Sequence, residues 1–357
     1  MIISLWLLRR FGVAVLFVTL SLLALLSMFD LLANANSVTE EAAYPTLSLF
    51  YYWLLRAPSI LVFILPFAVL IAALKTFATL ASHQESVPLQ TSGFSLYRIA
   101  AVFSAGALVM GFGQFHFVDR IVTSATAQLA EWEADSYRNL PKLVLTPGKQ
   151  EWLSSGNYII SIEGASNDGR RLEAPTLIWR NEKGVATRYL EAEWATFVDE
   201  SWTLANVSEL NFLTDEISLH KSLPVAIDLL PLHFAFLNRQ PEVLRTSELM
   251  ILGSGTVETQ LHPARHYLVA AWHRVAQPFG AVVMVLLAAP VALQLTRSGN
   301  RILFVVAALV MGFLYFVFES VLLTLGNTGE LPVQVAVWGP GLLFSLVGLV
   351  SMLHQQR

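Results

Sequence analysis

The sequence has no cysteine and little charge, and each absence limits what the protein can be. Without cysteine it forms no disulfide, no thiolate metal site and no lipidated cysteine anchor. Charged residues make up 13% of the chain, against about 25% in an average soluble domain. The net charge of −4 gives no reason to expect nucleic acid as a partner.

Motifs for catalysis and nucleotide binding are also missing. The chain lacks the phosphate loop Gly-x4-Gly-Lys-Ser/Thr, the Gly-x-Ser-x-Gly nucleophile elbow and the His-Glu-x-x-His metal motif. His262 and His266 have a spacing that metal sites use on a helix, but Pro263 lies between them, which favours interfacial histidines. We therefore expect no active site, no metal and no cofactor in this chain.

Hydrophobic residues make up 55% of the chain and fall in blocks at both ends. A helix needs about 20 apolar residues to cross the hydrocarbon core of a bilayer. Six stretches qualify, residues 11–33, 51–81, 96–118, 267–295, 302–325 and 332–353. Each is apolar on every side, which suits burial in lipid or in a bundle. The sequence predicts a membrane α-helical protein with six transmembrane helices.

Basic residues in the short loops set the orientation by the positive-inside rule. If both termini are cytoplasmic, the outer short loops carry one basic residue, Arg56. The inner side then carries Arg9, Arg10, Lys75, Arg98, Arg297, Arg301 and Arg357. The middle of the chain is therefore expected outside the cytoplasm.

The middle segment, residues 121–265, reads first as a helix that leaves the membrane and then as short strands. Apolar residues alternate with polar ones over residues 157–163, 172–180, 187–198 and 201–207. Turn residues separate them, which is typical of an antiparallel sandwich or jelly roll. A polar linker and short helix follow at 231–248. We expect helices 1–3 in residues 1–120, a β jelly-roll-like domain in 121–265 and helices 4–6 in 266–357.

Ionisable residues inside the spans are candidate functional residues, because they are costly to place there. A charged side chain at the bilayer centre costs about 2.5–3.5 kcal/mol even on the insertion scale that gives the lowest values. Arg274 and Glu319 lie well inside the fourth and fifth spans. A structural ion pair, with each other or with backbone, and a contact with a lipid headgroup or substrate are both open for them. Asp30, near the outer end of the first span, suits interfacial solvation.

The inner loop between the second and third spans, residues 83–95, is too long for a tight turn. Glu85 and Pro88 suit the first turn of a short surface helix, and Gly93 suits its end. In a chain without an ATPase motif, such a helix at about residues 83–93 suggests a coupling element that docks on a separate ATPase.

Here the sequence resembles a known family. The run from Glu85 to Phe94 is similar to the coupling-helix signature Ser-Glu-Leu-x-x-Met-x-Ala-x-Gly of the LptF/LptG permeases of lipopolysaccharide export. Residues 65–70, 152–163, 272–278, 297–301, 331–332 and 336–340 resemble other parts of that family in the same order. The resemblance is nearly full length and looks more like LptG than LptF.

The resemblance implies a permease subunit of an ABC transporter in the bacterial inner membrane, with a periplasmic β domain. It would pair with a second LptF/LptG-type permease and with an LptB-type ATPase dimer, which would bind ATP and Mg²⁺. Lipopolysaccharide would pass from the membrane to LptC- and LptA-type proteins that form a bridge towards the outer membrane. Glu85, Gln90, Ser92 and Gly93 would contact the ATPase, and Arg274 a lipid A phosphate.

Two departures from the family pattern stand out. Ser86 and Pro88 replace apolar residues of the coupling signature, which bears on the affinity for the ATPase. The outer end of the first helix, Phe29 to Asn34, lacks the lysines that many LptG chains present to lipid A. This departure implies a lipid A with fewer phosphates or recognition carried by the other permease.

Two other classes of protein stay open on the residues alone. One is a secondary transporter of an amphiphile, which would show ion-gradient dependence and usually has internal repeats and broken helices. The other is a membrane sensor or assembly factor with a ligand-binding outer β domain, which would not copurify with an ATPase.

Reversing the charge of Glu85 tests the coupling assignment. We expect Glu85→Lys to lose copurification of the ATPase and to stop export while the helices stay folded, because a docking carboxylate becomes repulsive to the groove that accepts it. Affinity purification and an export assay measure this. Normal copurification and export by Glu85→Lys would show that the loop does not couple.

Overall fold

The computed structural model describes residues 2–40, 42, 44–82, 96–134, 137, 151–155, 157–166, 169–181, 184–198, 200–212, 216–227, 229–231, 234, 241–254, 258–259, 263–297 and 301–354. The chain divides into two compact units. One contains residues 1–141 and 272–357, and the other contains residues 142–271. The domain boundaries expected from the sequence lay at residues 120/121 and 265/266.

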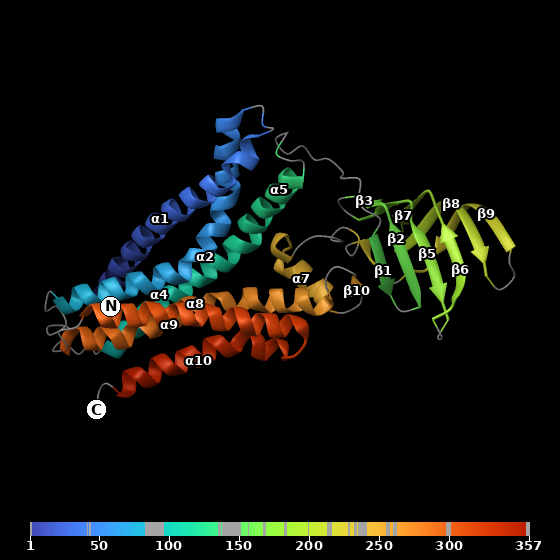
Figure 1. Cartoon of the computed structure of the whole chain (residues 1–357). Coiled ribbons are helices and arrows are strands. Elements are labelled where there is room, and N and C mark those ends of the chain that lie inside the picture. Colours follow the sequence, from blue (N-terminus) through green and yellow to red (C-terminus); the bar gives the residue numbers. More distant parts are fainter. Residues whose placement is uncertain are drawn as a thin grey trace. The chain divides into compact units, whose positions relative to one another are not determined.

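Within the described ranges, six helical stretches are long and apolar enough to cross a membrane. They are α1 (Ile2–Thr39), α2 (Pro45–Ser82), α4 (Leu96–Phe117) with its continuation, α8 (Ala264–Arg297), α9 (Arg301–Thr328) and α10 (Val333–His354). The six predicted helices are confirmed. α1 begins and α10 ends at the same end of the bundle, where α8 ends and α9 begins (Figure 1).

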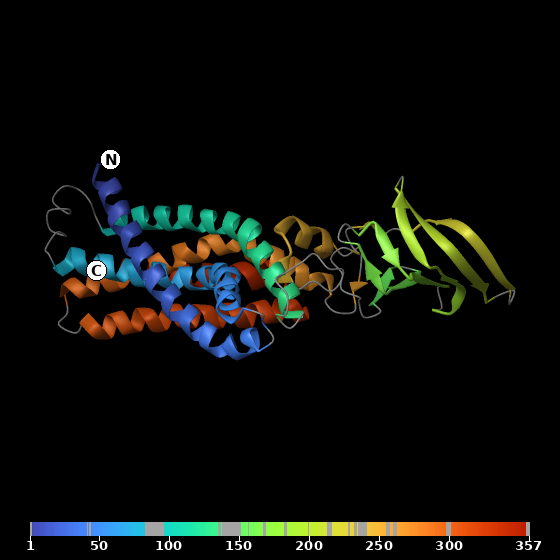
Figure 2. The same ribbon diagram turned by 90° about the horizontal axis from the view of Figure 1, so that it is seen from above.

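α1 and α2 are longer than predicted. Each has 38 residues, or about 57 Å of helix against about 30 Å of hydrocarbon. The predicted first span ended where polar residues begin near the end of α1. The helix continues beyond that point, because its Leu31 and Val38 pack in one cluster with Tyr52 and Leu55 of α2. Figure 2 shows α1 crossing the other helices at an angle.

The third span continues beyond its predicted end. A π-helical segment, Val118–Val122, joins α4 to α5 (Thr123–Ala134) without a break. The expected helix leaving the membrane is therefore an extension of the third transmembrane helix, and residue 121 lies inside it.

Two glycines allow α8 to lie close to its neighbours. A Cβ on Gly111 of α4 would lie 2.5 Å from the carbonyl oxygen of Pro278, and one on Gly348 of α10 would lie 2.7 Å from that of Leu286. Small residues at such crossings let membrane helices pack backbone to backbone. In the most apolar stretch of α8, 61% of the residues are buried, against 17% in that of α9. α8 is therefore the central helix of the unit.

The second unit contains a ten-stranded antiparallel sheet in the order β10-β1-β2-β5-β6-β8-β7-β4-β3, with β9 also paired to β8. The strands are β1 (Glu151–Ser155), β2 (Tyr158–Ile162), β3 (Gly164–Ala165), β4 (Arg171–Glu173), β5 (Thr176–Arg180), β6 (Ala186–Glu191), β7 (Trp194–Val198), β8 (Ser201–Asn211), β9 (Glu216–Val225) and β10 (Glu258–Thr259). β8 pairs with β7 over its first half, with β6 over its second half and with β9 along its length. One long strand thus joins the two halves of the sheet.

The antiparallel sheet was predicted, but two of its strands were read as too long. Residues 172–180 form β4 and β5, which are separated at Ala174-Pro175, and residues 187–198 form β6 and β7. Ala174 has a positive φ of 44°, and proline cannot donate to a ladder, so the chain turns there. β9 was missed, and its apolar Ile217 and Leu219 are 72% and 81% exposed.

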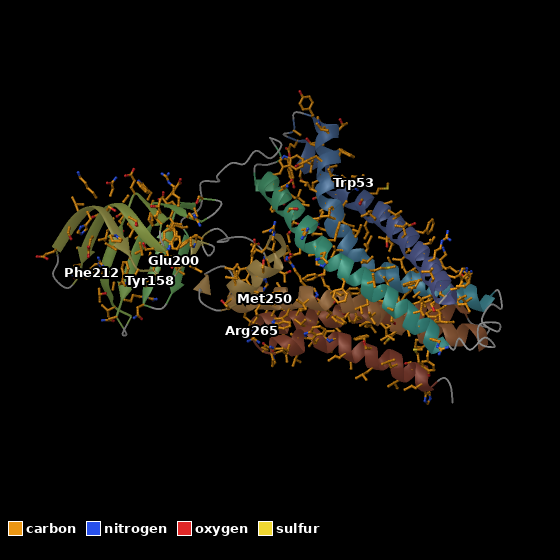
Figure 3. All side chains as sticks on the ribbon, turned by 180° about the vertical axis from the view of Figure 1, so that it is seen from behind. Trp53, Tyr158, Glu200, Phe212, Met250 and Arg265 are labelled. Carbon is orange, nitrogen blue, oxygen red and sulfur yellow. The ribbon has the colours of Figure 1, made fainter. Side chains whose placement is uncertain are left out.

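The core of the sheet unit is mainly apolar, and the indole of Trp202 within it has a hydrogen-bond partner. Trp202 is fully buried, and its indole Nε1 donates to the carbonyl of Leu229 at 2.7 Å. Ile160, Leu177 and Leu190 belong to the same buried cluster. A short helix was expected within residues 231–248, and α7 (Thr246–Gly253) overlaps only the last three of them and packs on the start of α8. Figure 3 labels Tyr158 and Phe212 on the sheet and Met250 on α7.

The contact between Gly111 and Pro278 gives a stability test with a matched control two residues away. Gly111→Leu should lower the thermal unfolding midpoint of the purified chain, since overpacking costs roughly 1–3 kcal/mol and backbone cannot yield easily. A Cβ on Gly113 meets nothing within 4 Å, so Gly113→Leu should stay within about 0.5 kcal/mol of the wild type. Equal midpoints for both variants would contradict the close crossing of α4 and α8.

Candidate functional site

The predicted site residues fall into two groups. Glu85, Gln90, Ser92 and Gly93 lie outside the described residues, so their coupling role stays a prediction. Asp30, Arg274 and Glu319 lie in the transmembrane unit. Asp30 and Glu319 line two separate pockets, and Arg274 is buried on α8.

Asp30 on α1 is not simply solvated, as the sequence suggested, but forms an ion pair with α2. The guanidinium Nε of Arg56 lies 3.3 Å from Asp30 Oδ1, and the Tyr52 phenol hydrogen-bonds to the same carboxyl group. The pairing lowers the cost of a carboxylate close to the membrane. The Arg56 side chain remains 42% exposed and that of Asp30 20%, so the guanidinium can still meet a further anion.

The ion pair borders an apolar pocket between α1 and α2. This α1–α2 pocket has a volume of about 440 Å³. It is lined by Leu26, Phe29, Asp30, Arg56, Ser59, Ile60 and Phe63. A basic group beside apolar walls suits an amphiphile with an anionic headgroup, because the two parts of such a molecule need these two surroundings.

Aromatic packing holds this end of α2 in place. The ring of Tyr51 meets Trp132 of α5 edge-on at 5.3 Å, and Tyr52 meets Tyr137 at 6.4 Å. Such pairs add about 0.5–1.5 kcal/mol beyond area burial. Arg56 is therefore carried by a rigid helix that α1 and α5 both support, and Figure 3 shows Trp53 on the same stretch of α2.

Glu319 of α9 contacts His273, the neighbour of the Arg274 that the sequence analysis considered as its partner. Its Oε1 lies 3.4 Å from His273 Nε2 on α8 and accepts a hydrogen bond of 3.1 Å from Tyr315 Oη. Sequence reasoning considered Arg274 as the partner and missed His273. His273 is part of the run Trp272-His273-Arg274, to which the sequence already drew attention. Adjacent residues of a helix point about 100° apart, so the sequence does not show which of His273 and Arg274 faces Glu319.

Arg274 lies in the interior of α8 and is only 7% exposed. It makes contacts within the protein. Two roles were open for Arg274 on the sequence. A structural contact inside the protein fits this burial better than a contact with a lipid headgroup does.

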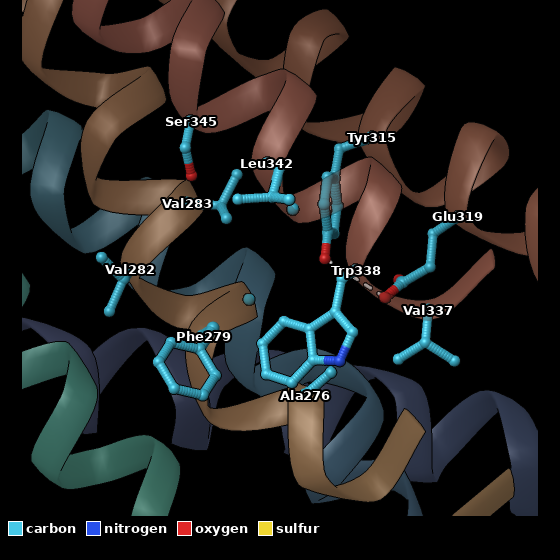
Figure 4. A pocket seen from close by; sticks show the side chains of 12 residues that line it. Ala276, Phe279, Val282, Val283, Tyr315, Glu319, Val337, Trp338, Leu342 and Ser345 are labelled. Carbon is cyan, nitrogen blue, oxygen red and sulfur yellow. Dashed lines mark hydrogen bonds between the residues drawn. The ribbon is translucent and has the colours of Figure 1, made fainter. Parts of the chain in front are cut away.

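Glu319 lines a second pocket, between α8, α9 and α10, with a volume of about 120 Å³. Its aromatic walls are Phe279, Tyr315 and Trp338, and the rings of Phe279 and Trp338 meet edge-on at 5.3 Å. Figure 4 shows Trp338 between Phe279 and Glu319, with Ala276 and Tyr315 next to it. We call this the α8–α10 pocket. Its single carboxylate makes it opposite in charge to the α1–α2 pocket.

No group of three or more His, Cys, Asp or Glu side chains that could hold a metal ion occurs in the part of the chain that the structure describes. His266 and His273 lie within that part, and His262 lies outside it. The expectation of no metal and no cofactor stays a prediction.

Comparison with known proteins agrees with this architecture. The sequence matches the family model for the lipopolysaccharide export system permease LptF/LptG over residues 6–354. The LptG permease of Escherichia coli strain K12 is 25% identical over 359 residues, which cover 95% of this chain and 94% of that protein. The LptG permease of Haemophilus influenzae is 25% identical over 301 residues, which cover 82% of this chain and 81% of that protein.

Proposed function

Because the chain belongs to the LptF/LptG family of lipopolysaccharide export permeases, we propose that it extracts lipopolysaccharide from the inner membrane and passes it to a periplasmic bridge. Energy would come from ATP hydrolysis in a separate subunit. Membership in the family makes the chain a multi-pass inner-membrane protein and a permease subunit, with LptG-like relatives.

The observation that carries the proposal is the extent of the match. The family model spans residues 6–354, so it includes all six membrane helices and the inserted sheet. A permease that delivers a lipid to a bridge needs both parts, a helical path through the membrane and a domain that hands the lipid on.

We place both termini and residues 83–95 in the cytoplasm and the sheet unit in the periplasm. The basic residues of the inner loops support this orientation. Glu85, Gln90, Ser92 and Gly93 would then dock on an LptB-type ATPase dimer, which binds ATP and Mg²⁺. The other partners would be a second LptF/LptG-type permease and the LptC- and LptA-type proteins of the bridge.

For the lipid itself, we assign the anionic headgroup to Arg56 and its apolar part to the α1–α2 pocket. The exposed guanidinium and the apolar lining support this assignment. Asp30 would hold Arg56 in place when no lipid is bound and compete with a phosphate for it. This arrangement offers a basic contact in a chain whose first helix lacks the lysines expected there.

A purification experiment tests the proposed function as a whole. The tagged chain should copurify with an ATPase and a second permease, and the complex in proteoliposomes should release lipopolysaccharide only when ATP is hydrolysed. Release that follows an ion gradient without ATP would point to a secondary transporter. Copurification with neither protein would remove the ABC assignment.

The Arg56 assignment predicts opposite effects from the two members of the ion pair. Crosslinking of lipopolysaccharide to a photoreactive residue at Phe63 should fall about tenfold or more in Arg56→Gln, because a hydrogen bond to a charged group is worth about 1.5–3 kcal/mol. In Asp30→Asn crosslinking should rise, since the competing carboxylate is gone. Quantitative gel analysis of the crosslinked species measures both.

Arg98→Gln is the matched control, since Arg98 is an exposed basic residue at the start of α4, near the opposite end of the bundle. Its crosslinking should equal that of the wild type. Unchanged crosslinking in Arg56→Gln, with a folded bundle, would show that the headgroup binds elsewhere.

A further inference from the structure

The α8–α10 pocket has no part in the lipid binding proposed above. The two oxygens of its carboxylate, that of Glu319, differ in their contacts. Tyr315 Oη and His273 Nε2 both contact the same oxygen of Glu319, Oε1. Among the described residues, these two contacts both fall on Oε1 and neither falls on Oε2. The Glu319 side chain keeps 17% of its surface exposed, so a ligand can reach it.

The pocket lies inside the hydrophobic span rather than at its edge. Glu319 lies nine residues before Thr328, where α9 ends, which is about 13 Å along the helix. Tyr315 donates a hydrogen bond to this carboxyl group and His273 lies beside it. A bound cation would further offset the cost of a carboxylate at this depth.

The walls of the pocket also favour a cation. Tyr315 and Trp338 lie beside the carboxylate, and Phe279 lies on the far side of Trp338 (Figure 4). Aromatic faces attract ammonium groups. A phosphate would be repelled by Glu319, so the exported lipid's anionic groups are excluded. The volume of about 120 Å³ corresponds to about four water molecules, enough for an ammonium group with about three attached carbons.

We propose that the α8–α10 pocket binds the ammonium group of an amine-bearing lipid. The ammonium donates to Oε2 of Glu319 and lies against the rings of Tyr315 and Trp338. The rest of the headgroup leaves past Phe279 and Leu342, which are 41% and 64% exposed, so the acyl chains stay in the bilayer. The amine can belong to a membrane phospholipid or to an amine-substituted form of the exported lipid.

Retained lipid on the purified full-length chain tests the site. The protein is equilibrated with equal amounts of phosphatidylethanolamine and phosphatidylglycerol of the same acyl chains, and bound lipid is measured by mass spectrometry. We expect the wild type to retain the ethanolamine lipid about tenfold over the glycerol lipid. Glu319→Gln should abolish this preference, because the amide cannot neutralise an ammonium group.

A second variant blocks the pocket and leaves Glu319 in place. Gly341 lines the pocket, and a Cβ there meets nothing within 4 Å. Gly341→Leu should therefore place side-chain volume in the pocket and remove the preference, even if Glu319→Gln does not fold. Glu330→Gln, which changes an exposed acid beyond the end of α9, should keep the wild-type preference.

Equal retention of the two lipids by the wild type would overturn the proposal, and so would an unchanged preference in Gly341→Leu. Competition with ethanolamine-substituted lipopolysaccharide identifies the carrier of the amine. Displacement by it, and not by the unsubstituted form, assigns the pocket to the exported lipid, whereas displacement by neither assigns it to phospholipid. The assay measures binding without export, so its failure leaves the proposed transport function untouched.

Discussion

The bilayer core offers no water to polar groups, and the rest of the transmembrane unit follows from this constraint. Backbone groups must be satisfied within each segment, which makes every span a helix. Side chains such as Asp30 and Glu319 persist there because another helix supplies a partner, Arg56 for the first and His273 for the second. Each pair therefore ties two helices together, and each has a pocket beside it.

Helix packing in this environment depends on shape rather than on hydrophobic attraction, since lipid tails are as apolar as leucine. α8 occupies the centre because Gly111 and Gly348 let two neighbours approach its backbone. The same helix carries His273 and Phe279. The position of α8 is thus what places the α8–α10 pocket, so packing at the glycines and chemistry at Glu319 are linked.

The spans were predictable because length and hydropathy decide them locally, and the partners were not because they depend on rotation and crossing angle. Asp30 and Arg56 are 26 residues apart, and no pattern in the sequence links them. Choosing between His273 and Arg274 required knowing which side of α8 faces α9. In the sheet, the alternating pattern continued through Ala174-Pro175, so the break between β4 and β5 was hidden.

The two pockets have complementary chemistry, and this separates two kinds of lipid group. At the α1–α2 pocket the accessible group is a guanidinium, which attracts phosphate and repels ammonium. At the α8–α10 pocket it is a carboxylate among aromatic rings, which does the reverse. A zwitterionic phospholipid cannot satisfy the first site with its amine, nor a phosphorylated glycolipid the second with its phosphates. The two pockets therefore select different parts of a lipid headgroup, a phosphate beside Arg56 and an ammonium group beside Glu319.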